Sequence, residues 1–369
     1  MLYSLLLLTF LLATGIQIFY YLFFFKRLAD YDCGREKFPL SAKEDFPADL
    51  IICAKNEEKN LVQNIPRILN QNDRLHKLLV VNDNSDDKSL YILKEIQKKS
   101  PTFDIINLTH TKSGAVGKKY ALSVGIKNAD ADVLLLTDAD CEPLSNDWVG
   151  RMKAGLGDKE IGLGYSPYAA YPGLLNLFIR YEAVWTAVQY LSFALAGLPY
   201  MGVGRNLIYR KELFARAGGF AKHAHIPTGD DDLFINAVAR ADNTTVILHP
   251  DTFILSEPKR DWRSYVRQKR RHLSAGVRYR LRHQILLGLL SATHFLHYTS
   301  GIALAFFDIT IFFTLLAVRL SVVLWIYRRI LKKLNDPKMW LWIPFLDFAY
   351  LFFYLFFATA LMNTNKTWN

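Results

Sequence analysis

The stretch Leu134-Leu-Leu-Thr-Asp-Ala-Asp140 indicates both the fold and the chemistry of this chain. An apolar run of strand length ends there in two carboxylates, Asp138 and Asp140. In an extended segment, residues i and i+2 point to the same side, so both carboxylates can reach one site. Acids at the carboxyl end of a buried strand suit a hard divalent cation held against a phosphorylated ligand. A solvated acidic turn explains an isolated pair equally well, so the rest of the chain must decide.

Apolar residues concentrate at the two ends of the 369-residue chain. Residues 1–25 carry no charge, and about 20 apolar residues suffice to span a bilayer. A cleaved signal peptide would show early basic residues and a small-residue cleavage site, so we predict a retained signal anchor over 1–25. Residues 285–307, 309–327 and 340–362 are predicted to be further spans. Arg319 falls inside the third of the four and must snorkel, face protein or mark a misplaced boundary.

Basic residues set the predicted orientation. They follow the first and third spans and precede the second, and the positive-inside rule places them in the cytoplasm. Four spans then put the middle of the chain in the cytoplasm and both termini outside. The alternative is three spans, with 285–327 forming a re-entrant or interfacial pair. The expected location is a bacterial cytoplasmic membrane. The three cysteines show no C-x-x-C spacing and suggest neither a disulfide framework nor a zinc site.

The middle of the chain alternates between strand and helix patterns. Strands are predicted over 49–54, 77–81, 103–108 and 132–137, and helices over 60–69, 88–99 and 118–128. This alternation predicts an α/β fold with a mostly parallel twisted sheet and flanking helices. We place this domain at 48–284, after a linker at 26–47. Residues 171–198 fit either an amphipathic helix or pair, or a plain core helix.

Polar residues gather where the predicted strands end. Ligands of such sheets bind beyond the carboxyl ends of the strands, where Asn56, Glu57 and Asp83 fall with Asp138 and Asp140. Lys118 begins a predicted helix after Gly117, but the segment lacks the spacing and the hydroxyl of a Walker phosphate loop.

Thr228-Gly-Asp-Asp-Asp232 places three acids before an apolar run. An acidic helix N-terminus explains one or two of them. Three adjacent carboxylates repel one another unless a cation or ligand compensates, and crowding raises at least one pKa, which suits a general base.

The segment 257–283 holds ten Lys and Arg residues against two acids, just before a predicted span. A juxtamembrane stripe that meets anionic lipid or a diphosphate fits better than a nucleic-acid patch. Gln268 and Arg271 lie three residues apart and share a helix face, so both can reach one ligand. Upstream, Gly202 and Gly204 precede Arg205 and Asn206, and glycines permit close approach of a ligand to the backbone.

Taken in order, these motifs resemble a membrane-bound family 2 glycosyltransferase with the GT-A fold, of the polysaccharide synthase and ceramide glucosyltransferase-like branch. The resemblance covers roughly 48–276 and rests on four segments: Ala54-Lys-Asn-Glu-Glu58, Val81-Asn-Asp-Asn-Ser-Asp-Asp87, Asp138-Ala-Asp140 and Thr228-Gly-Asp-Asp231. Gln268-x-x-Arg271-His272 resembles the Q-x-x-R-W motif of processive synthases. His272 replaces the tryptophan, which puts processivity in doubt.

The resemblance implies an inverting hexosyltransferase that uses Mg²⁺ or Mn²⁺ and a nucleotide-diphosphate sugar. Its acceptor would be lipid-linked or a polysaccharide at the bilayer, with no role for nucleic acid. The implied donor-binding residues are Ala54, Asn56, Glu57, Asp83, Lys118, Asp138, Gln268 and Arg271. Asp138 and Asp140 would hold the metal, and Arg205, Asn206 and His272 would contact the acceptor. Asp231 would be the base, with Asp230 and Asp232 as rivals.

Two other functions remain open at the level of sequence. A catalytically silent nucleotide-sugar-binding scaffold is disfavoured because every expected acid is present. A transporter or channel is disfavoured because the predicted spans carry few polar residues.

Overall fold

The computed structural model describes residues 1–34, 46–73, 75–109, 117–221, 226 and 229–362. They form two compact units. The sheet unit comprises residues 32–183 and 197–259, and the helical unit comprises 1–31, 184–196 and 260–369. Half of the predicted linker, residues 35–45, and Thr228 of the acidic motif lie outside the described residues. The first five residues of that predicted linker form a helix, α2 (Lys26–Asp30), so the linker begins later than expected.

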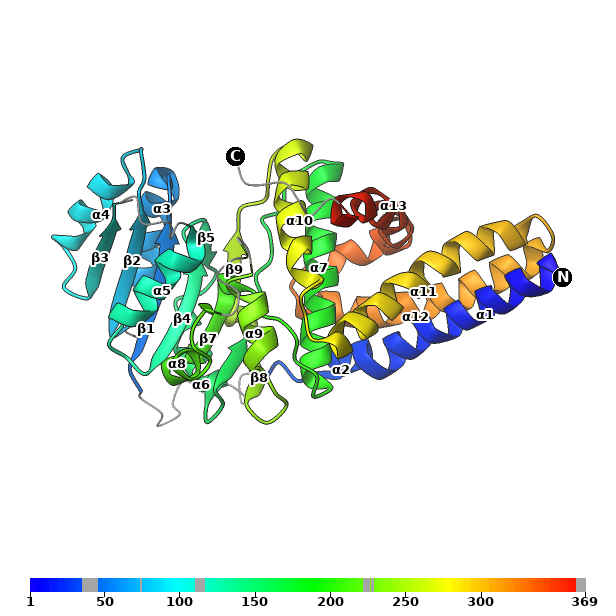
Figure 1. The fold of residues 1–369 in the computed structure, drawn as a ribbon, viewed down its shortest axis with the longest axis horizontal. Coiled ribbons are helices and arrows are strands. Elements are labelled where there is room, and N and C mark those ends of the chain that lie inside the picture. The colour runs from blue at the N-terminus through cyan, green and yellow to red at the C-terminus, as the bar shows by residue number, and fades with distance from the viewer. Residues whose placement is uncertain (35–45, 74, 110–116, 222–225, 227–228, 363–369) are drawn as a thin grey trace. The chain divides into compact units, whose positions relative to one another are not determined.

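A seven-stranded sheet forms the centre of the sheet unit (Figure 1). Its order is β3-β2-β1-β4-β7-β6-β8. The strands are β1 (Ala48–Ala54), β2 (Lys77–Asp83), β3 (Phe103–Leu108), β4 (Val133–Asp138), β6 (Ile161–Leu163), β7 (Leu207–Arg210) and β8 (Thr244–Val246). Only β7 pairs antiparallel with its neighbours. The predicted mostly parallel α/β fold is confirmed.

The central strands are apolar because both faces of a parallel sheet are covered. Leu50 and Ile52 of β1 and Leu134 of β4 are fully buried. The parallel register sets Cys53 beside Asp138 and Ala54 beside Asn82. The polar residues at the carboxyl ends of β1, β2 and β4 therefore share one edge of the sheet.

Helices connect these strands, and the first three of them lie at the predicted places. The helices are α3 (Glu58–Leu69), α4 (Ser89–Gln97), α5 (Lys118–Asn128), α6 (Trp148–Leu156), α8 (Lys211–Arg216) and α9 (Asp232–Val238). A second sheet pairs β5 (Cys141–Pro143) with β9 (Ile254–Ser256). Short helical turns occur at η3 (Gly204–Asn206) and η5 (Pro250–Thr252). The segment 171–198, left open above, contains one long helix, α7 (Leu174–Leu195), whose residues are divided between the two units.

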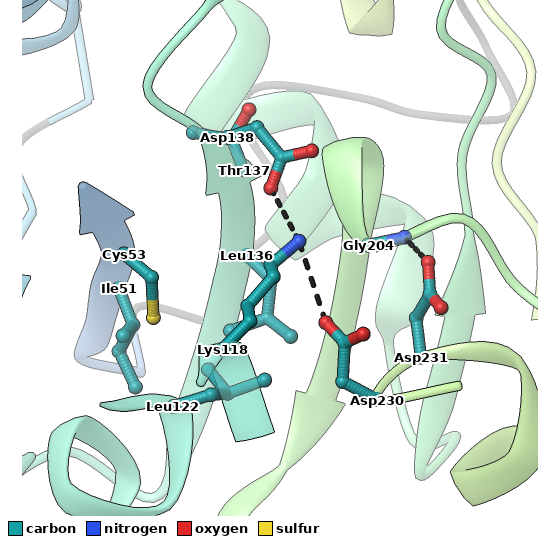
Figure 2. Close-up of a pocket in the computed structure, with 10 residues that line it drawn as sticks. All are labelled: Ile51, Cys53, Lys118, Leu122, Leu136, Thr137, Asp138, Gly204, Asp230 and Asp231. Carbon is teal, nitrogen blue, oxygen red and sulfur yellow. Dashed lines mark hydrogen bonds and ion pairs between the residues drawn. The ribbon is translucent and has the colours of Figure 1, made fainter. Parts of the chain in front are cut away.

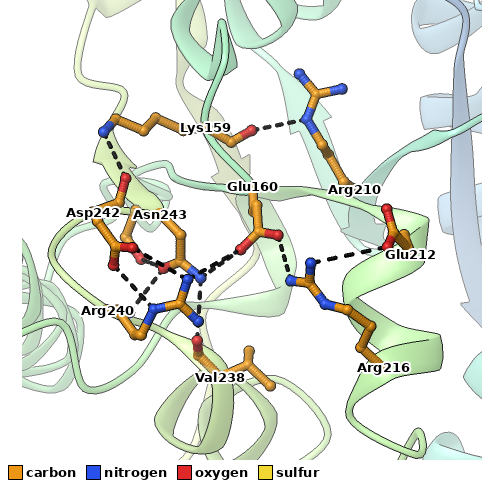
Figure 3. A network of polar contacts seen from close by, with 10 residues as sticks. Lys159, Glu160, Arg210, Glu212, Arg216, Val238, Arg240, Asp242 and Asn243 are labelled. Atoms are coloured by element: carbon orange, nitrogen blue, oxygen red, sulfur yellow. Dashed lines mark hydrogen bonds and ion pairs between the residues drawn. The ribbon is translucent and has the colours of Figure 1, made fainter.

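A polar network ties the far strands of the sheet together (Figure 3). Glu160, just before β6, pairs with Arg216 of α8 and accepts a hydrogen bond from the Asn243 amide at 2.7 Å. Arg210, at the end of β7, donates to the carbonyls of Gly157 and Lys159 at 2.9 and 3.2 Å. Three-residue strands have few ladder hydrogen bonds, so these side chains supply additional connections between them.

The helical unit contains α1 (Leu2–Phe19), η1 (Tyr20–Phe25), α2, α10 (Trp262–Gly276), α11 (Leu281–Ala305), α12 (Ile309–Lys333), η6 (Pro337–Trp342) and α13 (Ile343–Met362). Among the described residues, three segments are long and apolar enough to cross a membrane: Leu2–Asp30, Ile309–Lys333 and Pro337–Phe357. Figure 1 shows α1, α11 and α12 side by side, while α13 is seen nearly end-on. The four-span topology and its orientation stay predictions.

Helix α11, predicted to be a span, is not apolar enough to be counted with those three. Several of its polar side chains are buried inside the helical unit. His294 and His297 are at most 1% exposed, and Thr293 is 4% exposed. The hydropathy of α11 is low because these residues serve contacts between helices.

Arg319 of α12 is fully buried and faces protein. Its guanidinium forms two hydrogen bonds to Asp347 of α13, at 2.5 and 3.2 Å. Gln17 of α1 and Tyr298 of α11 supply further contacts at 3.2 and 3.4 Å. One ion pair therefore connects four helices of this unit.

Candidate active site

Lys118 lies at the centre of the carboxylate cluster at the sheet edge (Figure 2). Its Nζ is 2.7 Å from Asp138 Oδ1 and 3.3 Å from Asp230 Oδ2. Asp138 is the last residue of β4, Lys118 is the first residue of α5, and Asp230 lies just before α9. Figure 2 shows the ammonium between the two carboxylates. These residues line a solvent-open hollow of about 260 Å³ with Cys53, Gly204 and Asp231.

The cluster has more negative than positive charge, and the pKa values of its members reflect this. Partial desolvation in the hollow would by itself lower the pKa of Lys118, but the carboxylates of Asp138, Asp230 and Asp231 outweigh it and hold that pKa well above its usual range. Burial favours protonation of Asp138, yet the ammonium of Lys118 keeps the pKa of Asp138 below its ordinary value. Lys118 is therefore a cation and Asp138 an anion at neutral pH.

The predicted metal residues form a suitable donor set. Ligand atoms of Asp138, Asp140 and Cys141 all lie within 4.8 Å of one another. Burial and the neighbouring charge of Asp138 raise the pKa of Asp140. Oxygen ligands suit Mg²⁺ and Mn²⁺, so the residues present fit the predicted divalent ion.

The three acids before α9 have different surroundings. Asp231 caps the helix, since its Oδ1 accepts a hydrogen bond from the Asp232 amide at 2.8 Å. Its Oδ2 accepts a second hydrogen bond, from the Gly204 amide, at 2.6 Å. Burial and then the charge of Asp230 raise the pKa of Asp231. Asp232 is 8% exposed, and it is not among the residues that line the hollow, which disfavours it as the base.

Gly229 determines the backbone conformation of the loop that carries the three acids. Its φ is +81°, in the region that favours glycine, and an added Cβ would lie 2.5 Å from the side chain of Leu233. A larger residue would therefore displace the acidic motif.

The loops after β1 and β2 carry the predicted nucleotide-binding residues and are bonded to each other. The Asn56 amide donates to Ser85 Oγ at 2.9 Å, and Asn56 Oδ1 accepts the Asp86 amide at 2.8 Å. Asp83 ends β2 and is 6% exposed. Burial raises the pKa of Glu57, which follows Asn56. Asn56 thus holds two loops in register, and contact with a nucleotide stays a prediction for these residues and for Ala54.

Arg205 and Asn206, both predicted to contact the acceptor, differ in the contacts that their side chains make. Asn206 is fully buried, donates to the carbonyls of Tyr165 and Thr252 at 2.8 and 2.7 Å, and accepts from Trp148 at 3.1 Å. It positions the turn, and this geometry speaks against the predicted contact with acceptor. The guanidinium of Arg205 lies over the ring of Tyr168 at 4.4 Å.

Gln268, Arg271 and His272 lie on α10, in the helical unit. Arg271 and His272 are exposed, and Gln268 is half-buried. The i, i+3 spacing of Gln268 and Arg271 on one helix is confirmed, and their contacts with donor or acceptor stay predictions.

Sequence reasoning missed Tyr168 as a site residue, and it marked Gly204 only as a glycine that a ligand could approach, not as a hydrogen-bond donor to Asp231. Gly204 contributes only its backbone N–H, which no sequence pattern reveals. Tyr168 lies in an irregular segment where nothing marks it. The hydroxyl of Thr137, next to Asp138, donates to the Arg205 carbonyl at 2.8 Å and was likewise unassigned.

The chain resembles known proteins in sequence and in fold. Residues 49–216 match the family described as Glycosyl transferase family 2. They form a family 2 glycosyltransferase domain. This match ends before the acids ahead of α9 and before the helical C-terminal part.

Two curated relatives share parts of the sequence. The probable glycosyltransferase YdaM of Bacillus subtilis is 27% identical over 222 residues, which are 56% of this chain and 51% of that protein. A Methanococcus voltae protein, named dolichyl N-acetyl-alpha-D-glucosaminyl phosphate 3-beta-D-2,3-diacetamido-2,3-dideoxy-beta-D-glucuronosyltransferase, is 33% identical over 96 residues. That alignment covers 26% of this chain and 29% of the relative. The chain spans about half the length of the first relative and less of the second.

The fold extends beyond the matched family region. The mannosyltransferase PcManGT from Pyrobaculum calidifontis, solved in complex with GDP-Man and Mn²⁺, superposes with a TM-score of 0.63 at 18% identity. The superposition covers 99% of this chain and all of that one. At this identity the likeness establishes the fold.

Proposed function

We propose that this chain is an inverting, metal-dependent hexosyltransferase that moves a sugar from a nucleotide-diphosphate donor to a membrane-associated, lipid-linked acceptor. One observation carries the proposal. Lys118 bridges Asp138 and Asp230 at the carboxyl edge of a mostly parallel sheet, and residues 49–216, which include Lys118 and Asp138, match family 2 glycosyltransferases. Ligands of such sheets bind at this edge.

The proposed cation site consists of Asp138 and Asp140, with Cys141 adjacent. A bound Mg²⁺ or Mn²⁺ would supply Lewis-acid stabilisation of the charge on the leaving diphosphate. Lys118 adds a positive charge at the same carboxylates. Asn56, Glu57 and Asp83, at the ends of β1 and β2, would border the nucleoside.

We assign the base to Asp231. Two backbone amides fix the orientation of its carboxylate, and its pKa lies above the ordinary range, closer to neutral pH. Asp230 is the rival, but its carboxylate is paired with Lys118. Removal of a hydroxyl proton by Asp231, with attack opposite the leaving diphosphate, would invert the anomeric centre.

The substrates follow from two separate arguments. PcManGT, which shares the fold over nearly the whole chain, was solved with a nucleotide sugar and Mn²⁺. The Methanococcus relative is named for a dolichyl phosphate-linked acceptor, and three helices of this chain are apolar enough to cross a membrane. A polysaccharide acceptor is the alternative. In this proposal the protein is multi-pass and its sheet unit lies in the cytoplasm.

The decisive experiment is a donor screen on the full-length protein in detergent. UDP-, GDP- and dTDP-sugars would be tested for thermal stabilisation with Mn²⁺ or Mg²⁺, and then for release of nucleoside diphosphate with membrane lipid extract as the acceptor source. We expect one donor to bind and to turn over in a metal-dependent manner. Metal-dependent binding without turnover, under conditions where Asp231→Asn changes nothing, would instead support a silent scaffold.

A further inference from the structure

The backbone around Arg205 is fixed from three sides. The preceding amide, of Gly204, donates to Asp231 at 2.6 Å. The carbonyl of Arg205 accepts from Thr137 Oγ1 at 2.8 Å, and the next residue, Asn206, is bonded inside the core. The turn η3 therefore holds Arg205 between the strand end that bears Asp138 and the acids ahead of α9.

The side chain of Arg205 stacks on an aromatic ring, and no carboxylate of the described residues pairs with it. Its guanidinium stacks on Tyr168 at 4.4 Å. Among the described residues it forms no ion pair within 4.0 Å, and its Nη1 is buried without a hydrogen-bond partner. Lys118, by contrast, is shared by two carboxylates. A buried guanidinium donor without an acceptor is costly, so it indicates a ligand atom that completes it.

The surroundings keep this group charged. Burial would lower the pKa of Arg205, but it lies above its usual value, and the charges that oppose burial at neutral pH are the carboxylates of Asp138 and Asp140. A stacked guanidinium presents a planar fork of N–H donors, whose shape matches the oxygens of a phosphate. Because Asp138 and Asp140 are near it, the phosphate it meets would lie next to the proposed cation site.

We propose that Arg205 binds a phosphoryl group beside the Asp138–Asp140 site. This inference rests on the proposed function, and it names the chemical group that Arg205 would bind. The phosphoryl group has two possible sources: the diphosphate of the donor and the phosphate of a lipid-linked acceptor. Tyr168 is a positioning residue in this proposal, since it holds the plane of the guanidinium.

The test uses the full-length protein in detergent and two simple probes. Inorganic pyrophosphate with Mn²⁺ represents the donor, and dodecyl phosphate, compared with dodecanol, represents a lipid phosphate. Dissociation constants would be measured calorimetrically for wild type, Arg205→Met and Arg205→Lys. Arg216→Gln is the matched control, because it removes an arginine of the same unit that pairs with Glu160 outside the hollow.

We expect Arg205→Met to weaken one probe by about 10- to 100-fold, the loss typical of hydrogen bonds to charged groups. Arg205→Lys should retain part of the affinity, and Arg216→Gln should bind like wild type. A loss confined to pyrophosphate identifies the donor diphosphate, and a loss confined to dodecyl phosphate identifies the acceptor.

Two results would overturn the proposal: wild type that binds neither probe, or equal affinities in wild type and Arg205→Met for both. The Arg205→Lys variant guards against misfolding, because it keeps the charge over Tyr168. If Arg205 binds a probe but no nucleotide sugar turns over in the donor screen, then the proposed function fails while the phosphoryl site stands.

Discussion

Two clusters of charged residues, one in each unit, differ in charge balance and in exposure to water. In the helical unit, Arg319 and Asp347 are at most 1% exposed and form a one-to-one pair. Their remaining contacts come from neutral groups, including Gln17 and Tyr298. In the sheet unit, the side chains of Lys118 and Asp138 are 42% and 29% exposed. Lys118 there faces three carboxylates, two of which it contacts.

The difference separates a structural ion pair from a proposed ligand site. Removing one partner of a buried ion pair destabilises the fold, because the charge of the other partner is then buried without compensation. A solvent-accessible cluster with more carboxylates than cations can bind an added cation, which compensates the excess negative charge. The same residue types therefore form a structural ion pair in one unit and a proposed ligand site in the other. The charge balance of each cluster and its exposure to water distinguish the two cases.

The largest expected effect is in the sheet unit, at Asp231. Asp231→Asn should lower turnover by about 100- to 10,000-fold, the range of general-base catalysis, while the donor still binds. Turnover and donor affinity would be measured separately on the same preparation. Because the base acts deprotonated and the pKa of Asp231 is raised, wild-type turnover should fall on acidification at a higher pH than an ordinary aspartate would give. A greater loss in Asp230→Asn, with activity retained in Asp231→Asn, would transfer the role to Asp230.

The next effect is on the balanced pair. Asp347→Asn should destabilise the helical unit by about 3–5 kcal/mol, because it leaves Arg319 buried without its counter-ion. Thermal unfolding in detergent would measure the loss. The double variant Arg319→Met/Asp347→Leu should recover most of it, because an apolar pair carries no desolvation cost. If the double variant were as unstable as the sum of the single ones, the charges would not act as a pair.

A third change tests the excess of carboxylates. Asp140→Asn should weaken Mn²⁺ binding by at least about tenfold, the loss seen even for partners of metal ligands. Free Mn²⁺ measured by electron paramagnetic resonance gives the affinity directly. Glu142→Gln is a matched control, since Glu142 is two residues away and pairs with Arg67. Equal affinity in Asp140→Asn and wild type would remove Asp140 from the metal site.

The smallest expected effect is at Lys118. Lys118→Met should cost about 1 kcal/mol or less of stability, because Lys118 and Asp138 are partly exposed. The remaining carboxylates would then repel one another, so added Mn²⁺ should raise the melting temperature of this variant more than that of wild type. Equal stabilisation by Mn²⁺ would mean that Lys118 does not compensate these acids.

The long strands could be predicted because their signal is local. The predicted runs 49–54 and 103–108 are mostly apolar, interrupted only by Asp49, Asp104 and Asn107, and β1 and β3 coincide with them within one residue. The strands β5, β6, β8 and β9 have three residues each, too few for a pattern, and exist because a distant strand pairs with them. The predicted site residues at the sheet edge came from the rule that parallel strands end together. The burial of Asn206 could not be predicted, because it depends on contacts such as that with Trp148, 58 residues earlier.

The sequence by itself determined the alternation of strands and helices, the apolar ends and the order of the acidic motifs, since each is written in neighbouring residues. Only the tertiary structure decided which charges meet. It placed Lys118 between acids 20 and 112 residues away, aimed the Gly204 amide at Asp231, and paired Arg319 with Asp347. These contacts join segments far apart in the chain, and their energies depend on burial and distance, which a linear pattern does not contain.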